Sequence, residues 1–246
     1  MREIVLDTET TGFDPESGDR IVEIGAIELW NHLPTGKTYH QYINPKRDMP
    51  DEAFGVHGIG PDILSPPRDA KPGEVTLLDK PVFHEVGQAF ADFVGDSKLV
   101  IHNASFDMKF LNAELGWMNL PQMPFDQAID TLMIARKKFP GSPASLDALC
   151  RRFGIDNSNR TLHGALLDSE ILAEVYLELI GGRQPGLVLG ASIQASSSSG
   201  PAVDEWRPTA RPNPLPSRIT EAETSAHDAF VEKLGDDALW KKMRQA

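Results

Sequence analysis

The chain of 246 residues has a single cysteine, no long apolar run and no excess of basic residues. One thiol cannot form an internal disulfide, and Cys150 lies in a helical apolar pattern, so we expect a buried thiol and not a nucleophile. No stretch approaches the roughly 20 apolar residues that span a bilayer. We therefore expect a cytoplasmic protein without a membrane partner.

The formal net charge of −12 argues against a broad basic surface for gripping duplex DNA, because such a surface neutralises many phosphates with Lys and Arg. The acidity belongs to residues 1–184, which hold 17 Lys and Arg against 28 Asp and Glu. Residues 185–246 are nearly balanced, with 7 against 8. Contact with nucleic acid would therefore have to be local or mediated by metal ions.

A change of composition near residue 184 divides the chain into three parts. Residues 1–183 have the composition of a folded domain, whereas residues 184–217 are rich in Ser, Gly and Pro and are typical of a flexible linker. Residues 218–246 carry apolar residues at roughly helical spacing among charges. Such a short segment does not fold alone, so we expect it to dock on a partner.

The first part has the pattern of a mixed α/β domain. Strands are predicted at residues 3–6, 21–29 and 38–44 as an antiparallel meander, and at 99–101 and 128–130. Helices are predicted over residues 81–94, 105–115, 131–138, 145–153 and 165–180, with Pro81 in a first turn and Ser105 as an N-cap. Strands first, followed by alternating helices and strands, indicate a mixed sheet flanked by helices.

Two carboxylates follow the first strand, in the segment from Asp7 to Gly12. Side chains alternate along a strand, so Asp7 and Glu9 point to the same face. Like charges so close repel each other unless a proton or a cation intervenes, which favours a divalent metal ion. The alternative is a pair of solvated residues at a strand end.

Two further segments carry acids at helix starts. Asp107 falls in the first turn of a helix that follows a buried strand, where an acid also suits the helix dipole. Capping is the alternative there. His163 and Asp168 precede the last apolar helix, and they converge only if His163 lies on the preceding loop, where Gly164 eases the bend. The alternative is a helix cap beside a structural histidine.

Together, these three segments resemble the signature of the DEDDh 3′–5′ exonuclease family, and in particular its proofreading epsilon subunits of bacterial DNA polymerase III. The likeness extends through residues 54–59, 145–150 and 160–168 and covers roughly residues 1–182. It implies a ribonuclease-H-like fold. It also implies that Asp7, Glu9, Asp107 and Asp168 hold two divalent ions, Mg²⁺ or Mn²⁺, and that His163 is the general base.

The same resemblance points to Glu52 and His57 as contacts to the 3′-terminal nucleotide, together with Asp7, Glu9 and Asp168. Glu52 as a first-turn acid and His57 as a buried structural residue are the alternatives. No segment suits the reading of base edges in a groove, so we expect a frayed single-stranded 3′ end as substrate, with mismatches favoured because they unpair at lower cost.

Outside the domain, the resemblance implies two partners. The segment from Ala226 to Trp240 is similar to the tail that tethers this family to the polymerase subunit, and the peptide from Gln184 to Leu189 resembles a degenerate sliding-clamp motif. An ordinary linker start is the alternative for that peptide. Two other functions stay open: an RNA-trimming DEDDh exonuclease, and a non-catalytic module that joins polymerase to clamp.

Overall fold

The computed structural model describes residues 1–158, 162–182, 219–235 and 240. The chain divides into two compact units, residues 1–190 and 191–246, and each is described by itself. The predicted linker at residues 184–217, with its candidate clamp peptide, lies outside the described residues. None of the described helices combines the length and the apolar character that crossing a membrane requires.

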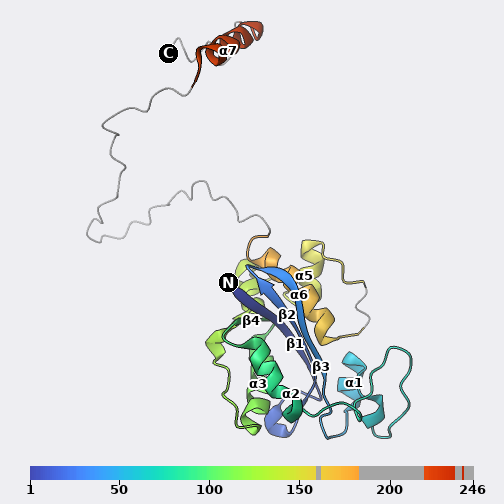
Figure 1. Cartoon of the computed structure of the whole chain (residues 1–246). Coiled ribbons are helices and arrows are strands. Elements are labelled where there is room, and N and C mark those ends of the chain that lie inside the picture. Colours follow the sequence, from blue (N-terminus) through green and yellow to red (C-terminus); the bar gives the residue numbers. More distant parts are fainter. Residues whose placement is uncertain (159–161, 183–218, 236–239, 241–246) are drawn as a thin grey trace, which may run out of the picture. The chain divides into compact units, whose positions relative to one another are not determined.

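A five-stranded mixed sheet forms the centre of the first unit, in the order β3-β2-β1-β4-β5 (Figure 1). The strands β1 (Arg2–Thr10), β2 (Ile21–Trp30) and β3 (Leu33–Tyr42) form the predicted antiparallel meander. β4 (Lys98–Ile101) runs parallel to β1, and β5 (Ala128–Asp130) runs parallel to β4. The carboxyl ends of these three parallel strands therefore meet at one edge of the sheet, where α/β proteins commonly bind ligands.

Helices cover both faces of the sheet. On one face lie α2 (Phe83–Val94) and α3 (Ala104–Trp117), and on the other lies α6 (Ala165–Leu179). The helices α4 (Thr131–Lys138) and α5 (Leu146–Phe153) pack against α6. The remaining helices are α1 (Asp51–His57), three 3-10 turns at Pro15–Ser17, Pro61–Ile63 and Phe125–Gln127, and α7 (Glu221–Lys233) in the second unit.

The alternation of β1 assigns its side chains to these two layers. Ile4 and Leu6 are fully buried against α2 and α3, whereas Val5 is fully buried on the α6 side. Burial of each such side chain stabilises the fold by about 1.5–3 kcal/mol. The same parity places Asp7 and Glu9 on the α6 side, so the packing of the core also aims the two carboxylates.

Several predicted boundaries differ from the structure. The N-cap of α3 is Asn103, in the left-handed conformation with φ 69°, and Ser105 lies inside the helix. Pro81 precedes the N-cap of α2, which is Val82. β3 begins at Leu33 and not near residue 38, because Pro34 is tolerated on an edge strand. Cys150 is fully buried, as predicted.

Candidate active site

A cavity of about 560 Å³ opens at the carboxyl ends of β1 and β4. The structure brings all the predicted metal ligands and the predicted base to its wall: Asp7, Glu9, Asp107, His163 and Asp168. Residues more than 150 positions apart in the sequence therefore share one solvent-filled space. The remaining lining residues are Thr8, His102, Asn103, Phe106, Leu132, Arg136, Ser145, Leu146 and Asp147.

The first two acids come from the end of β1, and Thr8 between them ties this strand to α3. The Thr8 hydroxyl donates a hydrogen bond of 2.7 Å to Oδ1 of Asp107, which is 3% exposed. Asp107 is four residues beyond the N-cap Asn103, which is itself the capping residue of α3. Asp107 is thus an acid of the first turn whose carboxylate is held by Thr8.

The other two predicted residues come from the start of α6. Asp168 lies in the first turn and is 3% exposed, and His163 lies on the loop before the N-cap Gly164, as their convergence requires. His163 Nδ1 is 3.3 Å from Oδ2 of Asp168, and its backbone amide donates to the Val56 carbonyl at 3.2 Å. Gly164 has an extended φ of −154°, so the bend does not depend on glycine.

Sequence reasoning missed the residues that dock α6 on the sheet. Glu23 of β2 is 2% exposed and accepts a 3.0 Å hydrogen bond from the backbone N of Ala165. Ser169 donates to the Gly25 carbonyl at 2.9 Å. A Cβ on Gly25 would lie 2.2 Å from the Ala165 backbone, so only glycine permits this approach. A glycine inside a strand was the available signal.

The acids of the cavity repel one another. Burial raises the pKa of Asp7 well above its usual range, and the charges of Asp107, Glu9 and Asp168 raise it further. Burial likewise raises the pKa of Asp107 to about 7, although the Thr8 hydrogen bond partly opposes this shift. Within the described residues, neither carboxylate forms an ion pair with Lys or Arg. A bound cation would relieve this repulsion.

The donor atoms fit a divalent metal ion. Ligand atoms of Glu9, His163 and Asp168 all lie within 4.8 Å of one another. Asp7 and Asp107 add carboxylates on the same wall. Carboxylate oxygens are the ligands that Mg²⁺ and Mn²⁺ prefer, so the residues present suit such ions. The position of His163 in the closest group also makes it a candidate ligand, besides the predicted general base.

A second cavity, of about 640 Å³, adjoins the first and shares Thr8, Glu9 and Phe106 with it. Glu52 and His57, the predicted nucleotide contacts, both line this second cavity. Of the four acids and the predicted base, only Glu9 is among the described residues that line both cavities. Its remaining wall comes from β1, the following loop and α1, with Thr10, Thr11, Gly12, Phe13, Asp14, Ser17, Asp19, Pro50, Ala53 and Val56.

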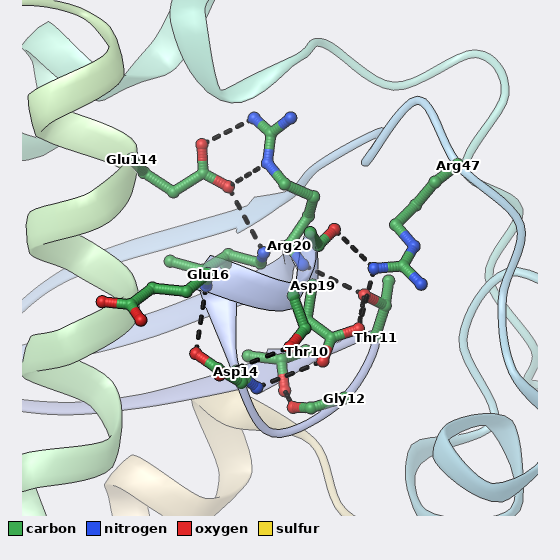
Figure 2. Close-up of polar contacts among 12 residues, drawn as sticks. Thr10, Thr11, Gly12, Asp14, Glu16, Asp19, Arg20, Arg47 and Glu114 are labelled. Atoms are coloured by element: carbon green, nitrogen blue, oxygen red, sulfur yellow. Dashed lines mark hydrogen bonds and ion pairs between the residues drawn. The ribbon is translucent and has the colours of Figure 1, made fainter.

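Figure 2 shows how the loop after β1 is held at this second cavity. The Asp19 carboxylate accepts hydrogen bonds from Thr11 Oγ1 at 3.3 Å and from the Asp14 backbone N at 3.1 Å. It also pairs with Nη1 of Arg47 at 2.7 Å. A Cβ on Gly12 would lie 2.3 Å from the Asp19 carboxylate, so a larger residue there would have to displace that side chain from its contacts.

Two ion pairs anchor this loop to α3. Arg20 donates through Nε and Nη2 to both oxygens of Glu114, at 2.7 and 2.6 Å, and Glu114 is 2% exposed (Figure 2). Lys109 pairs with Asp14 at 2.7 Å. Because two-point pairs of this kind fix geometry, the loop forms a rigid wall on which Phe13 stands 86% exposed.

His57 is buried, as a structural residue would be, and it also lines the second cavity, as a contact to the nucleotide would. It is 5% exposed, and its Nδ1 accepts a 3.0 Å hydrogen bond from the Ile59 amide, which leaves the proton of the neutral ring on Nε2. Burial lowers its pKa to about 4, an effect that the nearby Thr10 carbonyl only partly opposes. Nε2 has no hydrogen-bond partner in the described part of the chain, so a buried donor lines the second cavity.

Comparison with known proteins agrees with this geometry. A family model described as exonuclease (RNase_T) matches residues 4–176. The DNA polymerase III subunit epsilon of Rickettsia felis is 54% identical over 238 residues, covering 95% of this chain and 97% of the relative. That of Escherichia coli K12 is 42% identical over 250 residues, covering 98% and 97%.

Among solved structures, the nuclease domain of 3′hExo, a DEDDh family member bound to rAMP, has a similar fold. The TM-score is 0.56 at 22% identity, over 73% of this chain and 91% of that one. The fold and the acid-lined cavity define an exonuclease domain built on a ribonuclease-H-like mixed sheet. Within that class, the chain belongs to the family of DNA polymerase III epsilon subunits. The predicted fold class and family are thereby confirmed.

Proposed function

We propose that this chain is the proofreading 3′–5′ exonuclease of the replicative DNA polymerase, and that it removes mispaired 3′-terminal nucleotides by two-metal hydrolysis. The observation that carries the proposal is the gathering of Asp7, Glu9, Asp107 and Asp168, with His163, around one cavity. The relatives named DNA polymerase III subunit epsilon support the replicative context. In that role the chain would work in the cytoplasm.

The four carboxylates would hold two divalent ions, Mg²⁺ or Mn²⁺. When bound, the ions would lower the pKa of water and stabilise the negative charge on the leaving 3′ oxygen. The charges of Asp107, Glu9 and Asp168 all raise the pKa of Asp7, so bound cations would also relieve the repulsion at Asp7. The bound charge also explains how an acidic domain admits a phosphodiester at this one place.

His163 would accept the proton from the attacking water. Its side chain is 47% exposed at the rim of the cavity, so both water and substrate can reach it. The Asp168 carboxylate beside Nδ1 orients the ring, as carboxylates do for catalytic histidines. His163 must be neutral in this role, because only the neutral ring has a nitrogen that can accept a proton.

The second cavity would take the 3′-terminal nucleotide. His57 offers a buried Nε2 donor there, and Glu52, on the first turn of α1, can accept a hydrogen bond from the terminal sugar hydroxyl. Phe13 and Phe106 provide apolar surface for a base. A frayed single strand can reach these groups and a paired end cannot, so selection follows the cost of unpairing.

The C-terminal segment would tether the exonuclease to the polymerase subunit. Helix α7 leaves Ile219, Phe230, Leu234 and Trp240, on and around it, between 48% and 68% exposed within its own unit, and these are suitable anchors for a partner. The peptide from Gln184 to Leu189 would contact the sliding clamp. Tethering raises the local concentration of exonuclease at the primer end. Deletion of residues 201–246 should preserve activity on oligonucleotides and abolish co-purification with the polymerase subunit.

The test of the whole proposal is a time course on labelled primers, paired and mispaired, with and without Mg²⁺ or Mn²⁺. We expect mononucleotides from the 3′ end only with metal, and faster release from the mispaired end. A matched RNA primer tests the RNA-trimming alternative, which predicts the RNA to be degraded at least as fast. The absence of any metal-dependent release would favour the non-catalytic assembly module.

A further inference from the structure

The two adjoining cavities differ in the charge that they offer to a nucleic-acid strand. Among the described residues that line the first cavity, Arg136 is the one Lys or Arg. The described residues that line the second cavity include no Lys or Arg. Of these two sets of residues, only the first therefore offers a side-chain cation to a strand that passes the acids.

Arg136 is available for an external anion. It lies on the last turn of α4 and is exposed, and within the residues that the structure describes it forms no ion pair or hydrogen bond. Its neighbour on the wall is His102, whose pKa is lowered first by burial and also by the Arg136 charge. Arg136 and His102 therefore line the same cavity, and the guanidinium is near enough for its charge to act on the imidazole.

Two cations beside the second cavity are paired with acids that line it. Arg47 pairs with Asp19 and Lys109 pairs with Asp14, each at 2.7 Å, and both acids line that cavity. The exposed carboxylate of Glu52 adds negative charge there. Such a space suits a terminal nucleoside with a free hydroxyl and repels any additional phosphate.

The proposed function leaves one phosphate of the strand without a partner. The scissile phosphate would lie at the acids and their ions, and the next phosphodiester, on the 5′ side of the penultimate nucleotide, lies beyond them. In the direction away from the second cavity, the first cavity offers Arg136 as its cation. The planar guanidinium can contact a phosphate through two parallel hydrogen bonds.

We propose that Arg136 binds the phosphodiester 5′ of the penultimate nucleotide and so sets the polarity in which a single strand crosses the active site. This inference rests on the proposed function, because it takes the scissile phosphate to lie at the four acids. It adds a substrate contact on α4, a helix that carries none of the predicted catalytic residues.

The contact can be tested with two short substrates and the full chain. A thymidine dinucleotide without terminal phosphates has only the scissile phosphodiester, whereas the trinucleotide has one more on the 5′ side. Arg136→Ala should lower kcat/KM for the trinucleotide about tenfold, chiefly through KM, because a hydrogen bond to a charged group is lost. For the dinucleotide, kcat/KM should stay within about twofold of wild type.

Two controls separate this contact from a general effect of charge. Lys137→Ala removes the next cation of α4, which is exposed and does not line the cavity, and should leave both substrates unchanged. For the wild type, a neutral methylphosphonate at the 5′-side linkage of the trinucleotide should lower kcat/KM by about as much as Arg136→Ala lowers it for the normal trinucleotide. With the methylphosphonate substrate, Arg136→Ala should cause no additional loss. Arg136→Lys should recover part of the activity, since the charge returns without the planar fork.

The outcomes distinguish this inference from the proposed function. Equal losses on dinucleotide and trinucleotide would assign Arg136 to the scissile phosphate, and unchanged kinetics on both would remove it from the substrate path. Either result overturns the inference while metal-dependent cleavage persists. Absence of cleavage by wild type with metal would instead overturn the proposed function. Equal thermal unfolding temperatures of the variants and wild type establish that the fold is intact.

Discussion

Carboxylates at and away from the acid-lined cavity are in opposite electrostatic situations. Away from the cavity, Arg2 lowers the pKa of Glu28 to about 2 and Arg68 lowers that of Glu74 to about 2, each through hydrogen bonds from a guanidinium. At the cavity, burial and neighbouring acids raise the pKa of Asp7 and bring that of Asp107 to about 7. Glu28 and Glu74 thus have arginine partners, whereas among the described residues Asp7 and Asp107 have no Lys or Arg partner.

This contrast shows which acids serve the fold and which serve a ligand. A paired acid gains from being charged, so it contributes to stability. A buried acid among other acids loses by being charged, and the fold retains it against that cost. The cavity acids therefore suit the cation site that we propose, whereas Glu28 and Glu74 stabilise the fold through their arginine partners.

The largest effect should follow from Asp7→Asn, which keeps the size of the side chain and removes the carboxylate on which the other acids act. We expect exonuclease kcat to fall by at least about 10³-fold, since residues of one catalytic unit fail together. Release of mononucleotides from a labelled primer in Mg²⁺ measures this. A loss below tenfold would place the ions elsewhere.

His163→Ala should cause the next largest effect. We expect a fall in kcat of about 10²–10⁴-fold, the usual contribution of a general base. Calorimetric titration with Mn²⁺ should show affinity close to that of wild type if His163 moves a proton. A parallel loss of Mn²⁺ affinity would instead make His163 a ligand, in keeping with its place beside Glu9 and Asp168.

A moderate effect should appear in the pH dependence of metal-induced stabilisation. The metal-free folded state holds a proton on Asp107 up to a pKa of about 7, whereas the unfolded chain releases it near 3.8. The contribution of Asp107 to the stability of the metal-free fold is therefore fully present below pH 3.8 and is lost as the pH rises through 7. Protons compete with metal below 7, so the rise in melting temperature on adding Mg²⁺ should grow from pH 5.5 to pH 8.

Asp107→Asn is the matched control for that measurement. It should flatten the pH dependence of the metal-free melting temperature and reduce the rise that Mg²⁺ produces. The comparison of variant with wild type is needed because the lowered pKa of His57, about 4, acts in the opposite sense between pH 4 and 6.5. An unchanged metal response in the variant would exclude Asp107 from the ligand set.

The smallest effect should come from Glu28→Gln, on the other side of the comparison. Losing the charged partner of Arg2 should lower the melting temperature by about 2–4 °C and leave exonuclease kcat unchanged. Because the pKa of Glu28 is lowered from 4.5 to about 2, the difference should be full above pH 4.5 and should disappear as the pH falls toward 2. Any loss of activity would weaken the division between the two sets of acids.

Local sequence signals predicted the parts of the site that depend on one element. Alternation along β1 placed Asp7 and Glu9 on one face, and the helix predicted over residues 145–153 matches α5 to within one residue. The family resemblance supplied Asp107, His163 and Asp168 as a set, and the structure places them together. Their roles stay predictions.

The contacts that join distant segments could not be derived from local patterns. Glu23 reaches Ala165 across 142 positions, and Arg20 reaches Glu114 across 94. Periodicity reports which face of an element is apolar and not which element packs on it. Arg136 had no distinguishing signal, because a basic residue near a helix C-terminus is expected for the dipole alone. Only the tertiary structure shows that it lines the acid-rich cavity.

The most direct test of the central claim is the number of Mn²⁺ ions that the full chain binds at pH 8, measured by isothermal titration calorimetry. The account predicts two ions per chain for the wild type and none at this site when Asp7, Glu9, Asp107 and Asp168 are all replaced by Asn. A wild-type chain that binds no Mn²⁺, or a fourfold variant that still binds two ions, would contradict it.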